Sequence, residues 1–324
     1  MLRFVRSAAV ALLFGAMPAA GHAQEWPTKP IQLYMGFPAG SGVDVVARML
    51  QPSLEKTLGQ RLVIDYKPGA GGNVASELVA RAAPDGYTFL LGTAATHGVN
   101  AALYKKIPFD VEADFTPIST TNDVSNVLMV NPNVIDANSV QEFIAKVKAA
   151  PGKYNYASTG NGTGTHLAFA EFNHKAGLDM VHVPYKGGGH SSQAVIAGDV
   201  EMTFENPAVS LPFVQNGQLR ALAVTNDTRN RQAPDIPTMI EAGVPDFVSV
   251  SFTGIVAPAG TPPAIVTQLN AAIVESMRSP EVQAALDKLG VDMRAGTPEA
   301  FATFLAHERE KWGMLIRAAN IKAE

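Results

Sequence analysis

Three glycine-rich segments follow apolar, strand-like runs and precede helix-like runs, and each could bind an anion. The first is Phe37-Pro-Ala-Gly-Ser-Gly-Val-Asp44, and the others lie at 68–72 and 159–164. A helix start has backbone N–H groups without intrahelical partners and carries partial positive charge, which suits a carboxylate or phosphate. The sequence therefore predicts an anion cradle, although a tight strand-to-helix turn without a ligand explains the same residues.

Three ionisable side chains lie beside these segments or at a strand end, where they could contribute to binding. Asp44 begins the first of these helices, so it either complements the helix dipole or holds the shape of the turn by accepting backbone N–H bonds. His166 begins the helix after the third segment, where it is either a donor to a ligand or a structural histidine. Glu205 ends an apolar run, where a cleft-facing acid would accept an amine or discourage a second ligand carboxylate; a solvated carboxylate explains it equally.

The common catalytic and cofactor motifs are absent from the chain. No G-x-S-x-G elbow, G-x-x-x-x-G-K-[ST] loop or G-x-G-x-x-G turn occurs, and the seven histidines include no H-x-x-x-H pair. Because there is no cysteine, thiolate metal sites and disulfides are excluded. We therefore predict no enzyme activity, no catalytic residue, no cofactor and no metal site. The competing interpretation is a secreted hydrolase or lyase that uses His166, Glu205 or Asp44 as acid and base.

The first 23 residues are typical of a cleaved secretory signal peptide. Arg3 and Arg6 precede a short apolar stretch, and small residues around Ala23 suit cleavage. This segment carries two arginines and no acid, so its removal makes the formal charge of −4 more negative. That balance argues against nucleic acid as a partner. We expect a protein of about 300 residues outside the cytoplasm, which is long enough for two domains.

Apolar strand-like runs alternate with helix-like runs along most of the chain. This order predicts an α/β fold with a parallel sheet and with ligand-facing loops at the carboxyl ends of its strands. Pro52 should kink or divide the first long helix. A second alternating set begins near residue 127, and an apolar run at 248–256 is suited to carry the chain back. We therefore predict a discontinuous domain of 24–124 plus 248–324, with a second domain of 125–247 inserted into it.

Seven groups of short motifs occur in a fixed order along nearly the whole chain after the signal segment. They are Pro30-Ile-Gln-Leu33 with Phe37-Pro-Ala-Gly-Ser-Gly-Val-Asp44 and Arg48, Lys67-Pro-Gly-Ala-Gly-Gly72, Pro84-Asp-Gly-Tyr-Thr88, Val183-Pro-Tyr-Lys-Gly-Gly-Gly189, Leu219-Arg-Ala-Leu-Ala-Val-Thr225 with Arg229, Pro237-Thr238 with Glu241-Ala-Gly243, and Ala257-Pro-Ala-Gly-Thr-Pro262. Together they resemble the Bug-type extracytoplasmic solute receptors. These are the periplasmic substrate-binding subunits of tripartite tricarboxylate transporters.

The resemblance implies a two-lobed periplasmic binding protein with a ligand cleft between its lobes. It implies that the lobes close on a small carboxylate, either an aliphatic di- or tricarboxylate or an aromatic carboxylate, and deliver it to the membrane permease subunits. A sensor kinase is the alternative partner, and a monomer is expected. The family's ligand-binding positions correspond here to Phe37, Ala39, Gly40, Ser41, Thr93, Ala94, Ser158, Thr159, Gly160 and Thr163, with His166 at the rim and Glu205 where the family often has an acid that contacts a ligand amine.

Overall fold

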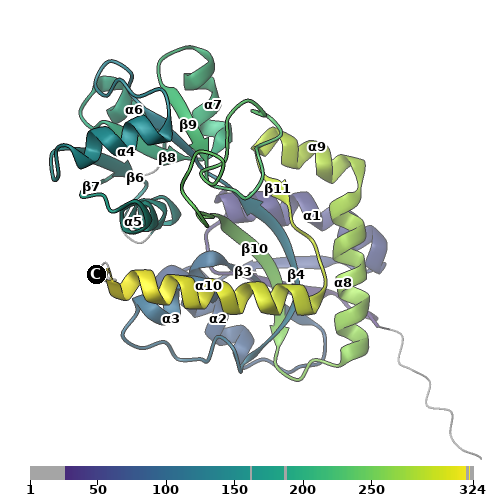
Figure 1. Cartoon of the computed structure of the whole chain (residues 1–324). Helices are drawn as coiled ribbons and strands as arrows, with labels where there is room; N and C mark the ends of the chain where they lie inside the picture. Colours follow the sequence, from purple (N-terminus) through teal and green to yellow (C-terminus); the bar gives the residue numbers. More distant parts are fainter. Residues whose placement is uncertain (1–25, 161–162, 186–187, 319–320, 322–324) are drawn as a thin grey trace, which may run out of the picture.

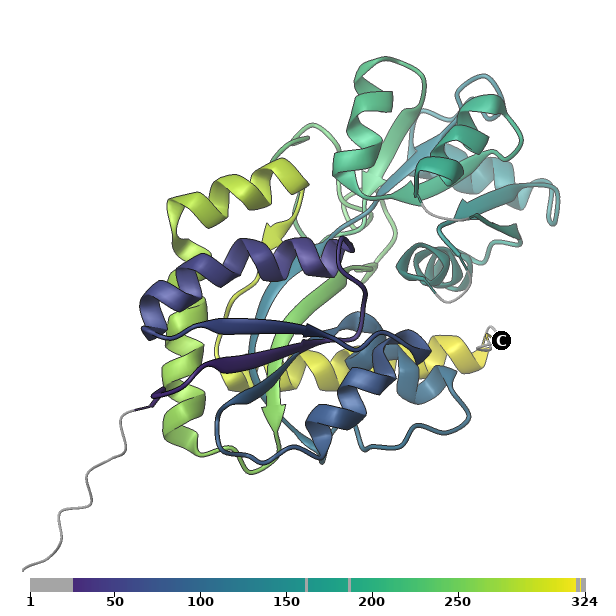
Figure 2. The same ribbon diagram turned by 180° about the vertical axis from the view of Figure 1, so that it is seen from behind.

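The computed structural model describes residues 26–160, 163–185, 188–318 and 321. The predicted signal peptide lies outside this part of the chain. The described residues form two α/β lobes, each built around its own sheet (Figures 1 and 2). We call the lobe with the six-stranded sheet lobe 1 and the lobe with the five-stranded sheet lobe 2. Both sheets have helices on both faces, so the predicted α/β class is confirmed.

The sheet of lobe 1 has the strand order β11-β4-β10-β3-β1-β2. The strands β1, β2 and β3 are parallel, as predicted, but β10 runs antiparallel to both β3 and β4. The expectation of a purely parallel sheet was therefore wrong, because the strand that returns from lobe 2 enters the sheet from the opposite end. The strands are β1 (Ile31–Met35), β2 (Leu62–Tyr66), β3 (Thr88–Thr93), β4 (Phe115–Val124), β10 (Ser251–Pro258) and β11 (Asp292–Met293).

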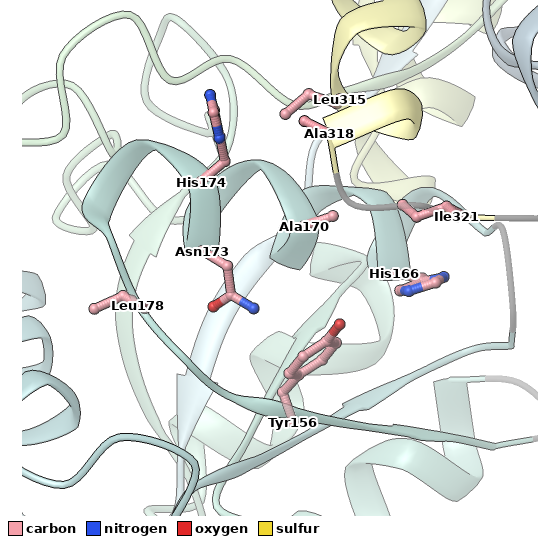
Figure 3. Close-up of a pocket in the computed structure, with 9 residues that line it drawn as sticks. All are labelled: Tyr156, His166, Ala170, Asn173, His174, Leu178, Leu315, Ala318 and Ile321. Carbon is pink, nitrogen blue, oxygen red and sulfur yellow. The ribbon is translucent and has the colours of Figure 1, made fainter.

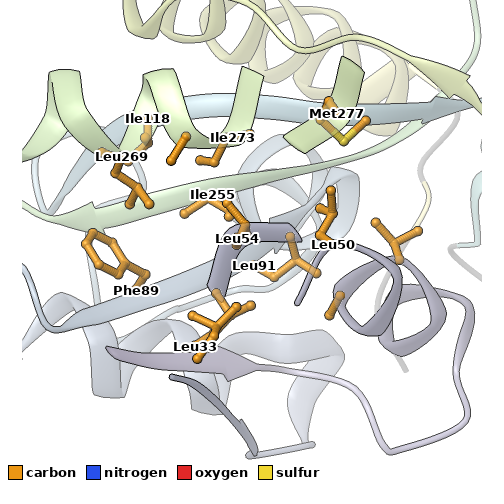
Figure 4. Close-up of a cluster of buried hydrophobic side chains, with 14 of the residues drawn as sticks. Leu33, Leu50, Leu54, Phe89, Leu91, Ile118, Ile255, Leu269, Ile273 and Met277 are labelled. Carbon is orange, nitrogen blue, oxygen red and sulfur yellow. The ribbon is translucent and has the colours of Figure 1, made fainter. Parts of the chain in front are cut away.

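Helices cover both faces of this sheet. On one face, α1 (Gly42–Leu58), α8 (Pro263–Arg278) and α9 (Pro280–Leu289) bury a cluster that includes Leu33, Leu54 and Ile273 (Figure 4). On the other face, α2 (Asn73–Ala80) and α10 (Pro298–Ala318) pack on Leu90 and Phe252. Between β3 and α3 (Asn100–Leu103) lies a single π-helical turn, η2 (Ala95–Val99), and a 3₁₀ turn, η1 (Ala70–Gly72), precedes α2.

We predicted that Pro52 kinks or divides this helix; α1 is continuous across Pro52, so the division was wrong, and the kink stays a prediction. Leu50, Leu54 and Leu58 all face the core cluster beneath this helix and are nearly fully buried. Burial of large aliphatic side chains stabilises by about 1.5–3 kcal/mol each, which offsets the backbone hydrogen bond that a proline removes from a helix interior.

Lobe 2 has the strand order β7-β6-β8-β5-β9. Alternate side chains of β5 enter different clusters: Leu128 and Val130 pack under α4 and α5, whereas Val127 and Met129 pack under α6. This alternation follows from the two-residue period of a strand that is covered on both faces. The elements are β5 (Val127–Val130), α4 (Val140–Lys148), β6 (Asn155–Ser158), α5 (Gly164–Ala176), β7 (Val181–Pro184), α6 (Gly188–Ala197), β8 (Met202–Glu205), α7 (Pro207–Gln215) and β9 (Arg220–Val224).

The chain passes between the lobes twice, once from β4 to β5 and once from β9 to β10. These crossings are joined to each other, because the N–H of Asn126 donates to Thr225 Oγ1 over 2.8 Å and the N–H of Ser249 donates to the carbonyl of Thr225 over 2.9 Å. The predicted boundaries near residues 124 and 247 lie in these connections, and that division stays a prediction. Among the described residues, no helix combines the length and apolar character that a membrane span requires.

Candidate functional site

A cavity of about 700 Å³ lies between the two lobes. Lobe 1 contributes the loop before α1, the end of β3, η2, α3, the facing ends of β4 and β10, and Trp312 of α10. Lobe 2 contributes the start of α5 and the start of α7. We call this cavity the interlobe cleft. Of the predicted ligand-binding residues, the cleft is lined by Phe37, Ser41, Thr93, Ala94 and Thr163.

The loop before α1 is held by Asp44. Its carboxylate accepts the N–H of Gly40 over 2.7 Å, the hydroxyl of Tyr66 over 2.6 Å and Nε of Arg48 over 3.0 Å. Burial raises the pKa of Asp44, but these three donors outweigh burial and leave the pKa below its ordinary value. The interpretation that Asp44 keeps the shape of the turn by accepting a backbone N–H is confirmed.

The bond to Asp44 changes what this loop can offer a ligand. The N–H of Gly40 is already used, and neither Gly40 nor Ala39 lines the cleft. Ser41 Oγ accepts the N–H of Asp44 over 3.3 Å, so Ser41 is the N-cap residue of α1. Gly40 has a φ of 82°, a backbone conformation that glycine adopts without strain. The loop therefore presents the ring of Phe37 and the outer side of Ser41 to the cleft.

The start of α5 faces this loop from lobe 2. Thr163 is the N-cap residue, but its side chain makes no capping bond and instead donates to the carbonyl of Gly160 over 2.7 Å. Both Thr163 and Gly164 line the cleft. The first N–H groups of a helix have no intrahelical acceptor and favour an anion. Of the two opposing helix starts, α5 is the one without a side-chain cap or an acidic residue in its first turn.

Ser158, Thr159 and Gly160 support α5 and are not among the residues that line the cleft. Thr159 donates its N–H to Thr165 Oγ1 over 2.9 Å, and Ser158 Oγ lies 2.6 Å from Nε2 of His182 and 3.1 Å from the carbonyl of Gly160. Three of the predicted ligand-binding residues, Ser158, Thr159 and Gly160, thus stabilise the start of α5 through hydrogen bonds and do not line the cleft.

The end of β3 supplies the base of the cleft. Thr93 donates its N–H to Thr96 Oγ1 over 2.9 Å and lies opposite Thr253 of β10. The amide of Asn100 donates to the carbonyl of Gly71 over 3.0 Å, which ties α3 to η1. These polar side chains already satisfy one another, so their main role at the cleft is to fix its shape.

His166 does not line the interlobe cleft. It faces a separate cavity of about 350 Å³ between α5 and the end of α10, with Tyr156, Asn173 and Leu315 (Figure 3). Its ring stacks on His182 at a centroid distance of 3.9 Å. Burial, with a smaller contribution from His182, lowers the pKa of His166 to about 4. A neutral, stacked imidazole fits the structural interpretation of this residue better than ligand binding.

Glu205 is also turned away from the cleft. The side chain is 5% exposed, and it accepts the N–H of Asn206 over 2.9 Å and Ser191 Oγ over 3.3 Å. Burial raises the pKa of this carboxyl. The neighbouring Asn206 lines the cleft instead, and its Oδ1 caps α7 by accepting the N–H of Ala208 over 2.8 Å.

The profile of the tripartite tricarboxylate transporter family receptors matches residues 46–321. The protein BugT of Bordetella pertussis is 34% identical over 323 residues, which cover 99% of each chain. This chain belongs to that receptor family. The predicted resemblance is thereby confirmed, and the receptor is a member of a family of periplasmic solute-binding proteins.

Two solved structures that resemble the receptor contain carboxylates. A protein of R. palustris with adipate is 32% identical, with a TM-score of 0.75 over 92% of this chain and 99% of that chain. MatC from Rhodopseudomonas palustris with bound malate is 30% identical, with a TM-score of 0.71 over 90% of this chain and 100% of that chain. The predicted two-lobed binding-protein architecture is confirmed by these similarities.

Sequence reasoning missed most of the apolar wall of the receptor's cleft. This wall includes Val45, Leu103, Val124, Leu167 and Trp312, which come from five different elements. Each side chain fits an ordinary core position in its own helix or strand. Only the packing of distant segments brings them together, so no local pattern could have identified them. Within the described part of the receptor, no group of three or more acidic or histidine side chains is placed to hold a metal ion.

Proposed function

We propose that this receptor captures a small organic carboxylate in the periplasm by closure of its lobes and delivers it to the membrane permease of a tripartite tricarboxylate transporter. The proposal includes export by a signal peptide at 1–23 and a monomeric receptor whose domains are 24–124 plus 248–324 and 125–247. Binding and release are the whole of its activity in this proposal. The observation that carries it is the uncapped start of α5, which faces the interlobe cleft at Thr163 and Gly164.

The chemistry of this helix start supports an anionic ligand. Backbone N–H groups at a helix start are fixed in direction and carry partial positive charge. Charge-assisted hydrogen bonds of this kind contribute about 1.5–3 kcal/mol each. Closure of the lobes would remove water from around them and increase that contribution. A few such bonds would support micromolar affinity after the cost of closure.

The proposed contacts are those residues that reach the cleft from both lobes. They are Phe37, Ser41, Thr93, Ala94 and Thr163 from the sequence prediction, together with Gly164 and Asn206. The homologues that were solved with adipate and malate support a carboxylate as the ligand class, since they share this architecture.

A first experiment tests whether any carboxylate binds. A thermal-shift screen of the purified receptor against malate, adipate, hexanoate, benzoate and terephthalate should raise the unfolding midpoint for at least one of them. A ligand at a hundred times its dissociation constant adds about 2.7 kcal/mol to the stability of the folded state. If none of these acids changes the midpoint, the proposed function is wrong.

A second experiment tests the helix start itself with two substitutions at one position. Gly164→Pro removes the N–H, and proline is well tolerated at the first position of a helix; the extended ψ of 162° at Thr163 also suits a residue before proline. Gly164→Ala is the control, because it adds a Cβ that meets Ser251 Oγ at 2.6 Å but keeps the N–H.

The two variants should differ in affinity for whichever acid the screen identifies. Loss of one charge-assisted bond predicts a dissociation constant about 10- to 100-fold weaker for Gly164→Pro than for Gly164→Ala, measured by titration calorimetry. Equal affinities would show that the N–H of residue 164 does not bind the ligand, even if the receptor binds the acid.

A further inference from the structure

Among the described residues that line the interlobe cleft, no side chain is charged at neutral pH. Its 28 lining residues include no Asp, Glu, Lys, Arg or His, and both lobes contribute aliphatic or aromatic surface. The apolar part extends from Val45 on α1 across Val124 of β4 to Leu289 and Val291, and Leu167 faces it from lobe 2. Within the described lining, an anionic ligand therefore meets favourable charge at the helix start, and the rest of its surface meets apolar and uncharged polar side chains.

The charged groups near the cleft are paired with one another and are not part of its described lining. Arg48 is bound to Asp44, Arg294 forms an ion pair with Asp123, and Lys311 lies 2.9 Å from Glu308. None of these six residues lines the cleft. A second carboxylate on the ligand would therefore have no cation within the described lining.

Several uncharged polar side chains of the lining are engaged within the protein, although the buried Nδ2 of Asn122 has no partner among the described residues. Thr163 donates to Gly160, Asn100 to Gly71, and Thr253 to Asn122. A carboxylate that leaves water must find compensating donors or a counter-charge, or binding becomes unfavourable. An apolar ring or chain gains free energy from the same transfer.

We propose that the cleft selects a monocarboxylate with an apolar body, such as an aromatic acid or a medium-chain aliphatic acid, over the matching dicarboxylate. This assignment rests on the proposed function, because it takes carboxylate capture as given and adds which carboxylates are selected. The single carboxylate lies at the start of α5, and the apolar body lies against the wall formed by α1, β4 and the segment at 289–291.

The test uses pairs of acids that differ only in the second carboxylate. Titration calorimetry compares benzoate with terephthalate and hexanoate with adipate, each against the purified receptor. The monocarboxylate should bind at least tenfold more tightly than its partner in each pair that gives binding. Equal or tighter binding of the dicarboxylates would overturn the selectivity and leave carboxylate capture intact. Silence of all four acids in a receptor that binds malate would overturn the selectivity alone, whereas silence of malate as well would overturn the proposed function.

A matched pair of variants tests the physical reason. Val45 lines the cleft and is 39% exposed, so a longer side chain can be accommodated there. Val45→Lys adds a cation to the apolar wall, and Val45→Gln adds a polar side chain without charge. The ratio of dicarboxylate to monocarboxylate affinity should rise at least fivefold in Val45→Lys relative to Val45→Gln. An unchanged ratio would mean that the missing counter-charge does not disfavour the second carboxylate, which would overturn the argument.

Discussion

Glu171 of α5 is a buried carboxylic acid at the contact between the lobes, and its replacement should reveal a pH-dependent stability. The side chain is 0% exposed, and neither of its oxygens accepts a hydrogen bond of good geometry from the described residues, although the hydroxyl of Ser249 is close enough to lower the pKa of this carboxyl. Lys311 of α10, in lobe 1, lies 4.0 Å away, but it also binds Glu308 at 2.9 Å and donates to the carbonyl of Val248. Figure 1 shows α5 facing α10 here.

The magnitude follows from the shifted pKa. Burial raises the pKa of Glu171 from 4.5 to about 7, against the opposing effects of Lys311, Lys175 and the hydroxyl of Ser249, whereas Glu308 reinforces it. One pKa unit corresponds to about 1.4 kcal/mol, so the ionised form destabilises the fold by at most about 3.5 kcal/mol. Since the folded-state pKa is the higher one, this penalty is absent below pH 4.5, grows as the pH rises, and is complete above pH 7.

The substitution Glu171→Gln keeps the shape of the side chain and removes its ionisation. Its free energy of unfolding relative to the wild type should increase by about 2 kcal/mol between pH 5 and pH 8, measured by urea denaturation with circular dichroism. The control is Glu310→Gln, the same change at an exposed site on α10, which should show no such difference. A Glu171→Gln effect that is equal at both pH values would refute the reasoning, because it would reflect packing and not ionisation.

Two further predictions test the packing and the cleft separately. Gly254→Ala should lower the free energy of unfolding by about 1–3 kcal/mol, since its Cβ would lie 2.4 Å from the buried ring of Phe301 and 2.9 Å from the carbonyl of Ser119; an unchanged urea midpoint would contradict the packing. The receptor has two tryptophans, of which Trp312 lines the cleft and Trp26 does not. A ligand should therefore change the fluorescence of a Trp26→Phe variant, and the same change should vanish in Trp312→Phe; a signal that survives in Trp312→Phe would place binding elsewhere.

The features that the sequence predicted well depend on neighbours in the chain. Phe37 to Asp44 joins a strand to a helix, and the shape of this turn depends on Gly40 and on the carboxylate of Asp44 four residues later. Such contacts are local, so residue types and spacing can indicate them. The same applies to the turn before α5, where glycine and threonine occupy the helix start.

The features that the sequence misplaced depend on the direction of a side chain in a buried element. Glu205 ends β8, a strand covered by helices on both faces, so a residue at its end is enclosed whichever way it points. The direction of the Glu205 side chain is set by its hydrogen bond from Ser191, which lies on α6. His166 is likewise directed by its stacking on His182 from β7. Neither partner is adjacent in the sequence, so no spacing rule predicts these directions.

Several buried ionisable side chains around the cleft are either paired or neutral, and one physical condition explains this. An ionisable side chain that is buried beside the cleft is tolerated only when it is paired or neutral. Asp44 pairs with Arg48, and Asp123 pairs with Arg294. The same condition explains why Glu171 would keep its proton until about pH 7, since Lys311 is shared with another carboxylate. In this way a protein with net negative charge has a cleft whose described lining carries no charged side chain.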